Sequence, residues 1–148
     1  MSMPQADELR IHIYDRLLAA GQPPTIQELA AHFRASDAEA RRWIADLKIG
    51  KTILPHPQTG EIWMAGPFAS TKTPYRVAGQ RVTWWANCAW DMLGVAMISR
   101  ESVRIDSQCT DCGEPLTLRS GPNERPDFDG VVHFLVPARH WYDDIGFT

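Results

Sequence analysis

The chain has 148 residues, enough to bury a core of its own and few enough for one compact unit or two small ones sharing an interface. Its 44% of hydrophobic and 22% of charged residues are typical of a folded globule and exclude a disordered or low-complexity chain. The net charge of -3 argues against a strong binder of nucleic acid or acidic membranes. The amino terminus has neither a basic start nor an apolar run, so we expect no secretory signal and a cytoplasmic location.

Three helices are predicted at the start of the chain. An apolar stripe at helical spacing covers residues 7–20 and is followed by glycine and proline. Residues 25–28 and 36–39 both match the capping box, in which a hydroxyl and a carboxylate three positions on satisfy two free helix amides. We therefore expect two more short helices, at about 26–33 and 37–47.

A hairpin is predicted next, because residues 52–54 and 61–64 are short apolar segments joined by a turn that contains proline and glycine. Three helices followed by a hairpin indicate a winged-helix-like helical domain over residues 1–66. The proline- and glycine-containing stretch at 66–80 then marks a domain boundary, and residues 67–148 form the second domain.

A winged helix raises the question of DNA binding. Its third helix would lie in the major groove, where Arg41, Arg42 and Lys48 would meet phosphates. Residues 1–66 nevertheless hold seven basic and eight acidic side chains, so phosphate repulsion offsets much of this gain. We do not expect nucleic acid to be the partner.

The most apolar stretch is residues 82–98, with 13 of 17 residues in the hydrophobic set. It is shorter than the ~20 residues that span a bilayer, so a buried helix is expected and no membrane partner. Residues 103–107 and 115–119 alternate in polarity on either side of a turn and predict a second hairpin. Residues 131–136 are expected to form a strand, and residues 141–148 to start a further element.

Cys88 and Asp91 are the most informative residues of the apolar stretch. On one helix, Trp84, Cys88, Asp91 and Val95 would share a narrow arc, which makes the thiol and the carboxyl neighbours. Burial and a nearby thiolate both raise a carboxyl pKa, so such a pair could hold a soft metal and deliver a proton near neutral pH. The alternative is a cysteine that packs as a small apolar residue and an aspartate that only braces backbone amides.

The cysteines are an odd number in a chain without an export signal, which favours metal or thiolate chemistry over a disulfide framework. Cys109 and Cys112 have the spacing of a metal knuckle. Tetrahedral zinc needs four ligands, so Cys88 with His133 or His140 would have to supply the others, although His133 is expected to face solvent. The alternatives are an inert pair of buried thiols, or one structural cysteine beside an incidental one.

Several segments, taken in order, resemble the alkylmercury (organomercurial) lyases. They are the helical amino-terminal module and, in the second half, Trp84-Trp85-Ala86-Asn87-Cys88-Ala89-Trp90-Asp91, Ser107 to Leu118, Val131 to Pro137, and Asp143 to Thr148. The resemblance covers nearly the whole chain.

This resemblance implies a reaction and its residues. Cys88 would bind mercury, Asp91 would take part in proton transfer to the departing carbon, and Cys109 would be structural. The carbon–mercury bond of an organomercurial substrate would break by protonolysis, leaving mercuric ion on thiolates from which cellular thiols remove it. A second mercury-binding cysteine is implied just after Phe147-Thr148, a role for which Cys112 is the candidate substitute within this sequence.

The expected fold is α+β, with a winged-helix-like three-helix bundle followed by an antiparallel sheet packed on a buried cysteine-bearing helix. The expected function is that of an organomercurial lyase or a lyase-like mercury-binding protein. The expected catalytic residues are Cys88 and Asp91. The candidate metal ligands are Cys88, Cys109 and Cys112, and zinc is a candidate ion for Cys109 and Cys112. One alternative is a winged-helix metal sensor that uses all three cysteines to regulate transcription. Another is an interaction module with inert thiols.

Overall fold

The computed structural model describes residue 4 and residues 6–146. It begins with three helices. Helix α1 is Ala6–Ala20, α2 is Ile26–Phe33 and α3 is Asp37–Leu47. Both predicted capping boxes are present, each satisfying amides at its helix start. A short 3-10 helix, η1 (Lys48–Gly50), extends α3.

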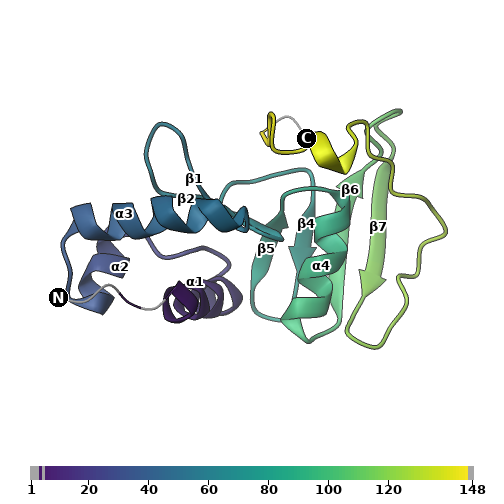
Figure 1. The fold of residues 1–148 in the computed structure, drawn as a ribbon. Helices are drawn as coiled ribbons and strands as arrows, with labels where there is room; N and C mark the ends of the chain where they lie inside the picture. Colours follow the sequence, from purple (N-terminus) through teal and green to yellow (C-terminus); the bar gives the residue numbers. More distant parts are fainter. Residues whose placement is uncertain (1–3, 5, 147–148) are drawn as a thin grey trace.

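The rest of the chain builds one antiparallel sheet with a helix against it (Figure 1). The seven strands lie in the order β1-β2-β3-β5-β4-β6-β7, and the fourth helix, α4 (Ala89–Ser99), packs against β4, β5 and β7. The strands are β1 Ile53–Pro55, β2 Ile62–Ala65, β3 Phe68–Ala69, β4 Arg76–Ala78, β5 Thr83–Ala86, β6 Val103–Gln108 and β7 Pro115–Ser120. Both predicted hairpins, β1–β2 and β6–β7, are therefore present.

The sheet continues from the helical module into the second half of the chain. Strand β2 pairs with β3 on the far side of residue 66, and β3 pairs in turn with β5. The hairpin that would be the wing of a winged helix is thus part of a larger sheet. The two domains over 1–66 and 67–148 remain a prediction.

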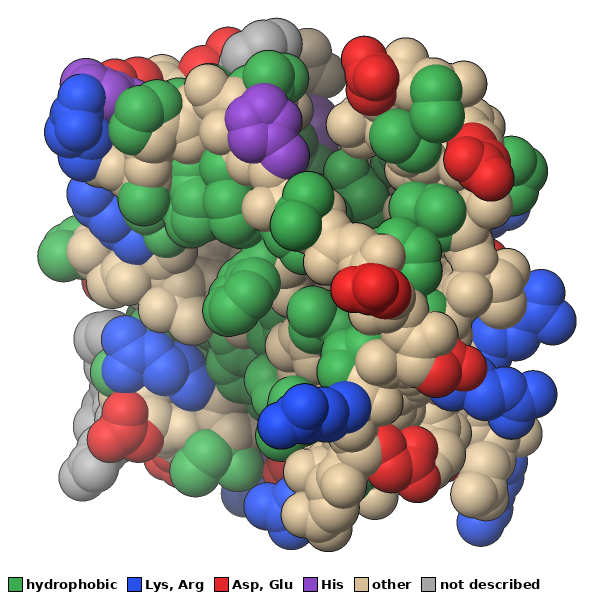
Figure 2. Space-filling model, turned by 90° about the vertical axis from the view of Figure 1, so that its right-hand side faces the viewer, with side chains coloured by type: hydrophobic (Ala, Val, Ile, Leu, Met, Phe, Trp, Pro, Cys, Tyr) green, Lys and Arg blue, Asp and Glu red, His purple; other side chains and the backbone are tan. Residues whose placement is uncertain are grey.

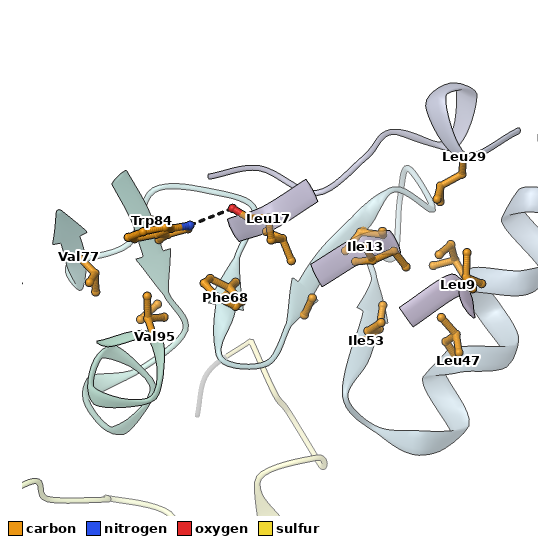
Figure 3. Packing of buried hydrophobic residues seen from close by; sticks show 14 of the residues in the cluster. Leu9, Ile13, Leu17, Leu29, Leu47, Ile53, Phe68, Val77, Trp84 and Val95 are labelled. Atoms are coloured by element: carbon orange, nitrogen blue, oxygen red, sulfur yellow. Dashed lines mark hydrogen bonds between the residues drawn. The ribbon is translucent and has the colours of Figure 1, made fainter. Parts of the chain in front are cut away.

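A single core joins the two halves (Figure 3). Leu9, Ile13 and Leu17 of α1 are completely or almost completely buried in this core. Trp84 of β5 is also buried, and its Nε1 donates a hydrogen bond of 2.9 Å to the carbonyl oxygen of Leu17. Helix α1 is therefore fixed to the middle of the sheet by packing and by a buried polar contact.

The expectation of one buried helix over residues 82–98 was wrong. Residues 83–86 form β5, in which Trp84 and Ala86 face the core, and the helix begins only at Ala89. This helix is not buried on both sides either, because Trp90 and Met97 are exposed. A strand that pairs on both edges followed by an apolar helix with one exposed face has much the same composition as one buried helix, which explains the error.

The strand expected at residues 131–136 was also wrong. The segment has no strand pairing among the described residues, and Val131 and Leu135 are 92% and 82% exposed. It runs on into a 3-10 helix, η2 (Ala138–His140), and turns up to residue 146. The last two residues of the element expected at 141–148 lie outside the described part. None of the helices in the described part is both long and apolar enough to cross a membrane.

Candidate functional site

Cys88 and Asp91 lie where β5 gives way to α4. Cys88 has extended backbone angles and is the residue that caps the helix, while Asp91 is its third helical residue. This is the spacing of a capping box, although Cys88 makes no side-chain cap hydrogen bond. Each side chain affects the pKa of the other, so the thiol and the carboxyl lie close together. The predicted proximity of the thiol and the carboxyl is therefore present, but it arises from the helix cap and not from a shared helix face with Trp84.

Burial governs the ionisation of this pair. It raises the pKa of the Cys88 thiol, and it outweighs the opposing effect of the Trp90 and Asp91 amides. Burial also raises the pKa of the Asp91 carboxyl, although hydrogen bonds from Asn87 and Cys88 act in the other direction. Both groups thus retain a proton more readily than exposed ones would, and each influences the ionisation of the other.

The pair opens into a cavity of about 440 Å³ with largely apolar walls. Leu54, Trp63 and Met64 of the first hairpin line one part of it, and the carboxy-terminal segment closes another with Phe134, Trp141, Tyr142 and Ile145. In Figure 1 this segment crosses the end of the sheet in yellow. An apolar cavity with one thiol and one carboxyl suits a small ligand that carries both a soft metal and a hydrocarbon group.

The carboxy-terminal segment is tied down at the mouth of the cavity. The Tyr142 hydroxyl donates a hydrogen bond of 2.9 Å to the carbonyl oxygen of Lys51, and the Lys51 ammonium lies 4.6 Å from the centre of the Tyr142 ring. The Trp141 indole donates to the carbonyl of Val136. The sequence analysis missed these aromatic residues because it placed part of the segment in a strand.

Asn87 is a second residue that the sequence analysis missed. It lines the cavity beside Cys88, and its side chain donates to Asp91. Its Oδ1 is buried and has no hydrogen-bond partner in the described part of the chain. An asparagine in an otherwise apolar stretch, next to the cysteine, was the available signal, since a buried amide calls for partners.

Cys109 and Cys112 lie elsewhere, on the turn between β6 and β7. Neither lines the cavity that holds Cys88. Cys109 is half-buried and Cys112 is exposed. The backbone amides of Cys112 and Asp111 and the Cys112 thiol lower the pKa of the Cys109 thiol. The two sulfurs are therefore close to each other, and the Cys109 sulfur has amide groups directed at it.

The described residues do not gather the four ligands that a tetrahedral zinc site would need. No group of three or more His, Cys, Asp and Glu side chains within residue 4 and 6–146 is close enough to hold a metal ion. His133 is exposed, as expected, and His140 pairs with Asp143 at 2.9 Å. The expectation that Cys88 with His133 or His140 would complete the Cys109–Cys112 site is thus not met in this part of the chain.

Helix α3 also gives little support to DNA binding. Arg41, one of the three basic residues considered for phosphate contact, donates from Nη1 to the carbonyl oxygen of Thr59 at 2.6 Å. Figure 2 shows the side of the molecule near β7, away from α3, and there too basic and acidic side chains are interspersed. A phosphate-binding surface would instead gather basic groups.

These features define an α+β protein with a coupled thiol and carboxyl at the start of a helix, inside an apolar cavity. The family model for alkylmercury lyase matches residues 68–147, more than half of the sequence, and the chain belongs to that family.

One similar solved structure is described as the crystal structure of the mercury-bound form of MerB2. The TM-score is 0.62 at 18% sequence identity, with 85% of this chain and 62% of that chain covered. At this identity the similarity shows a shared fold, and the chain spans less than two thirds of the length of that protein. A comparison with curated proteins gave no match.

Proposed function

We propose that the chain acts as an organomercurial lyase, or as a lyase-like mercury-binding protein, through Cys88 and Asp91. The observation that carries this proposal is the placement of the Cys88 thiol beside the Asp91 carboxyl, with both residues lining the apolar cavity. Membership of the alkylmercury lyase family supports it.

The first step would be capture of the metal. Mercury is soft and prefers thiolate ligands, but burial disfavours the thiolate form of Cys88. Asp91, as a carboxylate, would accept the thiol proton while the Cys88–mercury bond forms and the ligand previously bound to mercury leaves as a thiolate. The organic group then remains on mercury, and Asp91 now carries the proton.

The second step would be cleavage of the carbon–mercury bond. The Asp91 proton passes to the carbon, the electron pair of the carbon–mercury bond forms the new carbon–hydrogen bond, and the hydrocarbon departs. Asp91 returns to the carboxylate form, and mercuric ion stays on Cys88. A thiol from solution would bind the ion and lose its proton, and a second thiol would then displace Cys88, which takes up the proton of that thiol.

The walls of the cavity would contribute by binding the organic group and by limiting water. Trp63, Phe134 and Tyr142 offer apolar and aromatic surface opposite the pair. A dry environment also keeps the Asp91 pKa raised, which favours delivery of the proton to carbon.

The competing hypothesis of a metal sensor requires the three cysteines to act at one metal ion. The described part of the chain brings together no group of three such ligands, and Cys109 and Cys112 do not line the cavity of Cys88. The arrangement therefore supports lyase chemistry better than metal sensing.

The test is release of methane from methylmercury in excess thiol, measured by gas chromatography. Unaltered protein is expected to form methane above the thiol background, and Cys88→Ser is expected to bind no mercury in the cavity and form none. Asp91→Asn keeps the thiol but lacks a transferable proton, so methane formation should fall by roughly 100-fold or more while mercury still binds.

Asp129→Asn is the matched control, because Asp129 is exposed and does not line the cavity. It should retain the activity of the unaltered protein. Folded Asp91→Asn that forms methane at the full rate would remove the proton-transfer role. Absence of methane with unaltered, folded protein would remove the lyase activity itself.

A further inference from the structure

The turn between β6 and β7 carries two thiols that the proposed lyase reaction does not use. The chain reverses between Cys109 and Glu114: the Cys109 amide donates to the Glu114 carbonyl at 2.8 Å, and the Gly113 amide donates to the Cys109 carbonyl at 2.9 Å. Gly113 has a φ of 74° with no atom within 4 Å of an added Cβ, so glycine is favoured here by the backbone angle and not by lack of space.

The turn arranges its polar groups around one sulfur. The amides of Asp111 and Cys112 and the thiol of Cys112 all interact with the sulfur of Cys109. Cysteine binds metal as the thiolate, so binding releases the thiol proton. Cys112 is exposed, so an ion can reach the pair from solvent.

The number of available ligands limits which ion the turn could take. Zinc in a structural site takes four ligands, and no third His, Cys, Asp or Glu side chain of the described residues joins this pair. A soft ion that is satisfied by two thiolates fits the turn better, and Hg²⁺ is such an ion.

We propose that Cys109 and Cys112 form a second, surface site that binds a soft thiophilic metal ion, Hg²⁺ in particular, through two thiolates. On binding, two sulfur–hydrogen bonds break, two metal–sulfur bonds form and two protons pass to solvent, with no change of oxidation state. The site is separate from the cavity of Cys88, and it does not depend on the proposed lyase activity.

The experiment uses Cys88→Ser protein, in which these two cysteines are the thiols that remain. One equivalent of Hg²⁺ is added in the presence of a monothiol such as glutathione, the protein is desalted, and bound mercury is measured by elemental analysis. A chelating pair holds the ion against a monothiol, whereas a single cysteine exchanges it readily. Cys88→Ser is expected to retain about one mercury per chain, the stoichiometry of one two-thiolate site.

Removal of either sulfur tests the pair. Cys88→Ser/Cys112→Ser and Cys88→Ser/Cys109→Ser should each lose at least tenfold in mercury affinity in the competition. Cys88→Ser/Thr110→Ala is the control, because it alters the same turn, at an exposed residue, without removing a thiol. Circular dichroism establishes whether each variant is folded. If the Cys109 variant does not fold, the variant at exposed Cys112 decides the question.

Two outcomes would overturn the proposal. One is folded Cys88→Ser that retains no mercury against the monothiol. The other is a Cys112→Ser variant in the same background that retains as much mercury as its parent. Neither outcome bears on the lyase proposal, since Cys88→Ser lacks the thiol on which that reaction depends.

Discussion

Asn87 shows how one side chain can tune the candidate site. Its amide donates to the Asp91 carboxyl, and this contact lowers the Asp91 pKa while burial raises it. Its Oδ1 is buried in the cavity wall without a hydrogen-bond partner among the described residues. Leaving a buried acceptor unpaired costs free energy. Asn87 is therefore in a position to hold Asp91 at the edge of the cavity.

We predict that Asn87→Ala shifts the pH dependence of methane formation. The proposed reaction begins with Asp91 as a carboxylate, and loss of the Asn87 hydrogen bond raises the Asp91 pKa further. Less carboxylate is then present at a given acidic pH, so the acid limb of the kcat/KM profile should move to higher pH. A hydrogen bond to a charged group contributes about 1.5–3 kcal/mol, so activity on that limb should fall by roughly tenfold or more.

Asn123→Ala is the matched control, at an exposed asparagine in the turn after β7. Its profile should coincide with that of the unaltered protein. If Asn87→Ala loses activity equally at every pH, with no movement of the acid limb, Asn87 does not set the ionisation of Asp91.

At the scale of elements, the junction of α1 with β5 holds the site's strand in place. Helix α1 ends at Gly21, where an added Cβ would lie 2.4 Å from the carbonyl oxygen of Thr83. The carbonyl of Leu17 accepts hydrogen bonds from both the Gly21 amide and the Trp84 indole. Close backbone approach and a buried indole contact thus fix β5, and β5 leads directly into Cys88.

We predict that Trp84→Phe destabilises the whole protein. The Leu17 carbonyl keeps its bond from Gly21, so the loss is one net hydrogen bond plus the packing of the missing ring atoms. The free energy of unfolding should fall by about 1–3 kcal/mol, as measured by urea denaturation. Trp90→Phe, at a residue that is 61% exposed, should change it by less than about 0.5 kcal/mol. Equal effects of the two substitutions would contradict the role of the indole contact.

The elements that could be predicted from sequence are those with signals inside a few neighbouring residues. The three amino-terminal helices carry capping boxes and a glycine stop, and their bounds were close to those observed. The junction of β5 and α4 was missed because cysteine is not a usual helix cap and because the strand and the helix are equally apolar. The run of β-branched residues at 131–136 lacks a strand partner, and pairing is a long-range property that a short segment does not contain.

The site was predictable only in part for the same reason. The spacing of Cys88 and Asp91 implies proximity in either of two geometries, a helix face or a helix cap, so the pair could be inferred before its backbone was known. The aromatic wall from Phe134 and Tyr142 depends on a loop that returns to Lys51, 91 residues before Tyr142 in the sequence. A pattern within a few neighbouring residues cannot predict such a long-range contact.

For the molecule as a whole, the main consequence of the fold is that distant segments close one cavity. The first hairpin, the β5–α4 junction and the carboxy-terminal segment each supply part of its wall. The last of these is held by surface contacts at Tyr142, and such segments open more easily than a packed core. Access to Cys88 should therefore depend on how firmly this segment is attached.

We predict that Tyr142→Ala speeds alkylation of Cys88 by iodoacetamide several-fold, because it removes both the hydroxyl bond to Lys51 and the ring that lies against the Lys51 ammonium. Tyr142→Phe keeps the ring and should have an intermediate effect. The rate at each cysteine is followed by peptide mass spectrometry, and exposed Cys112 serves as the control within the same molecule, since it does not line the cavity. An unchanged rate at Cys88 would mean that the segment does not limit entry, whereas a matching rise at Cys112 would mean general unfolding. A rise confined to Cys88 would identify the carboxy-terminal segment as the part of the fold that controls access to the thiol.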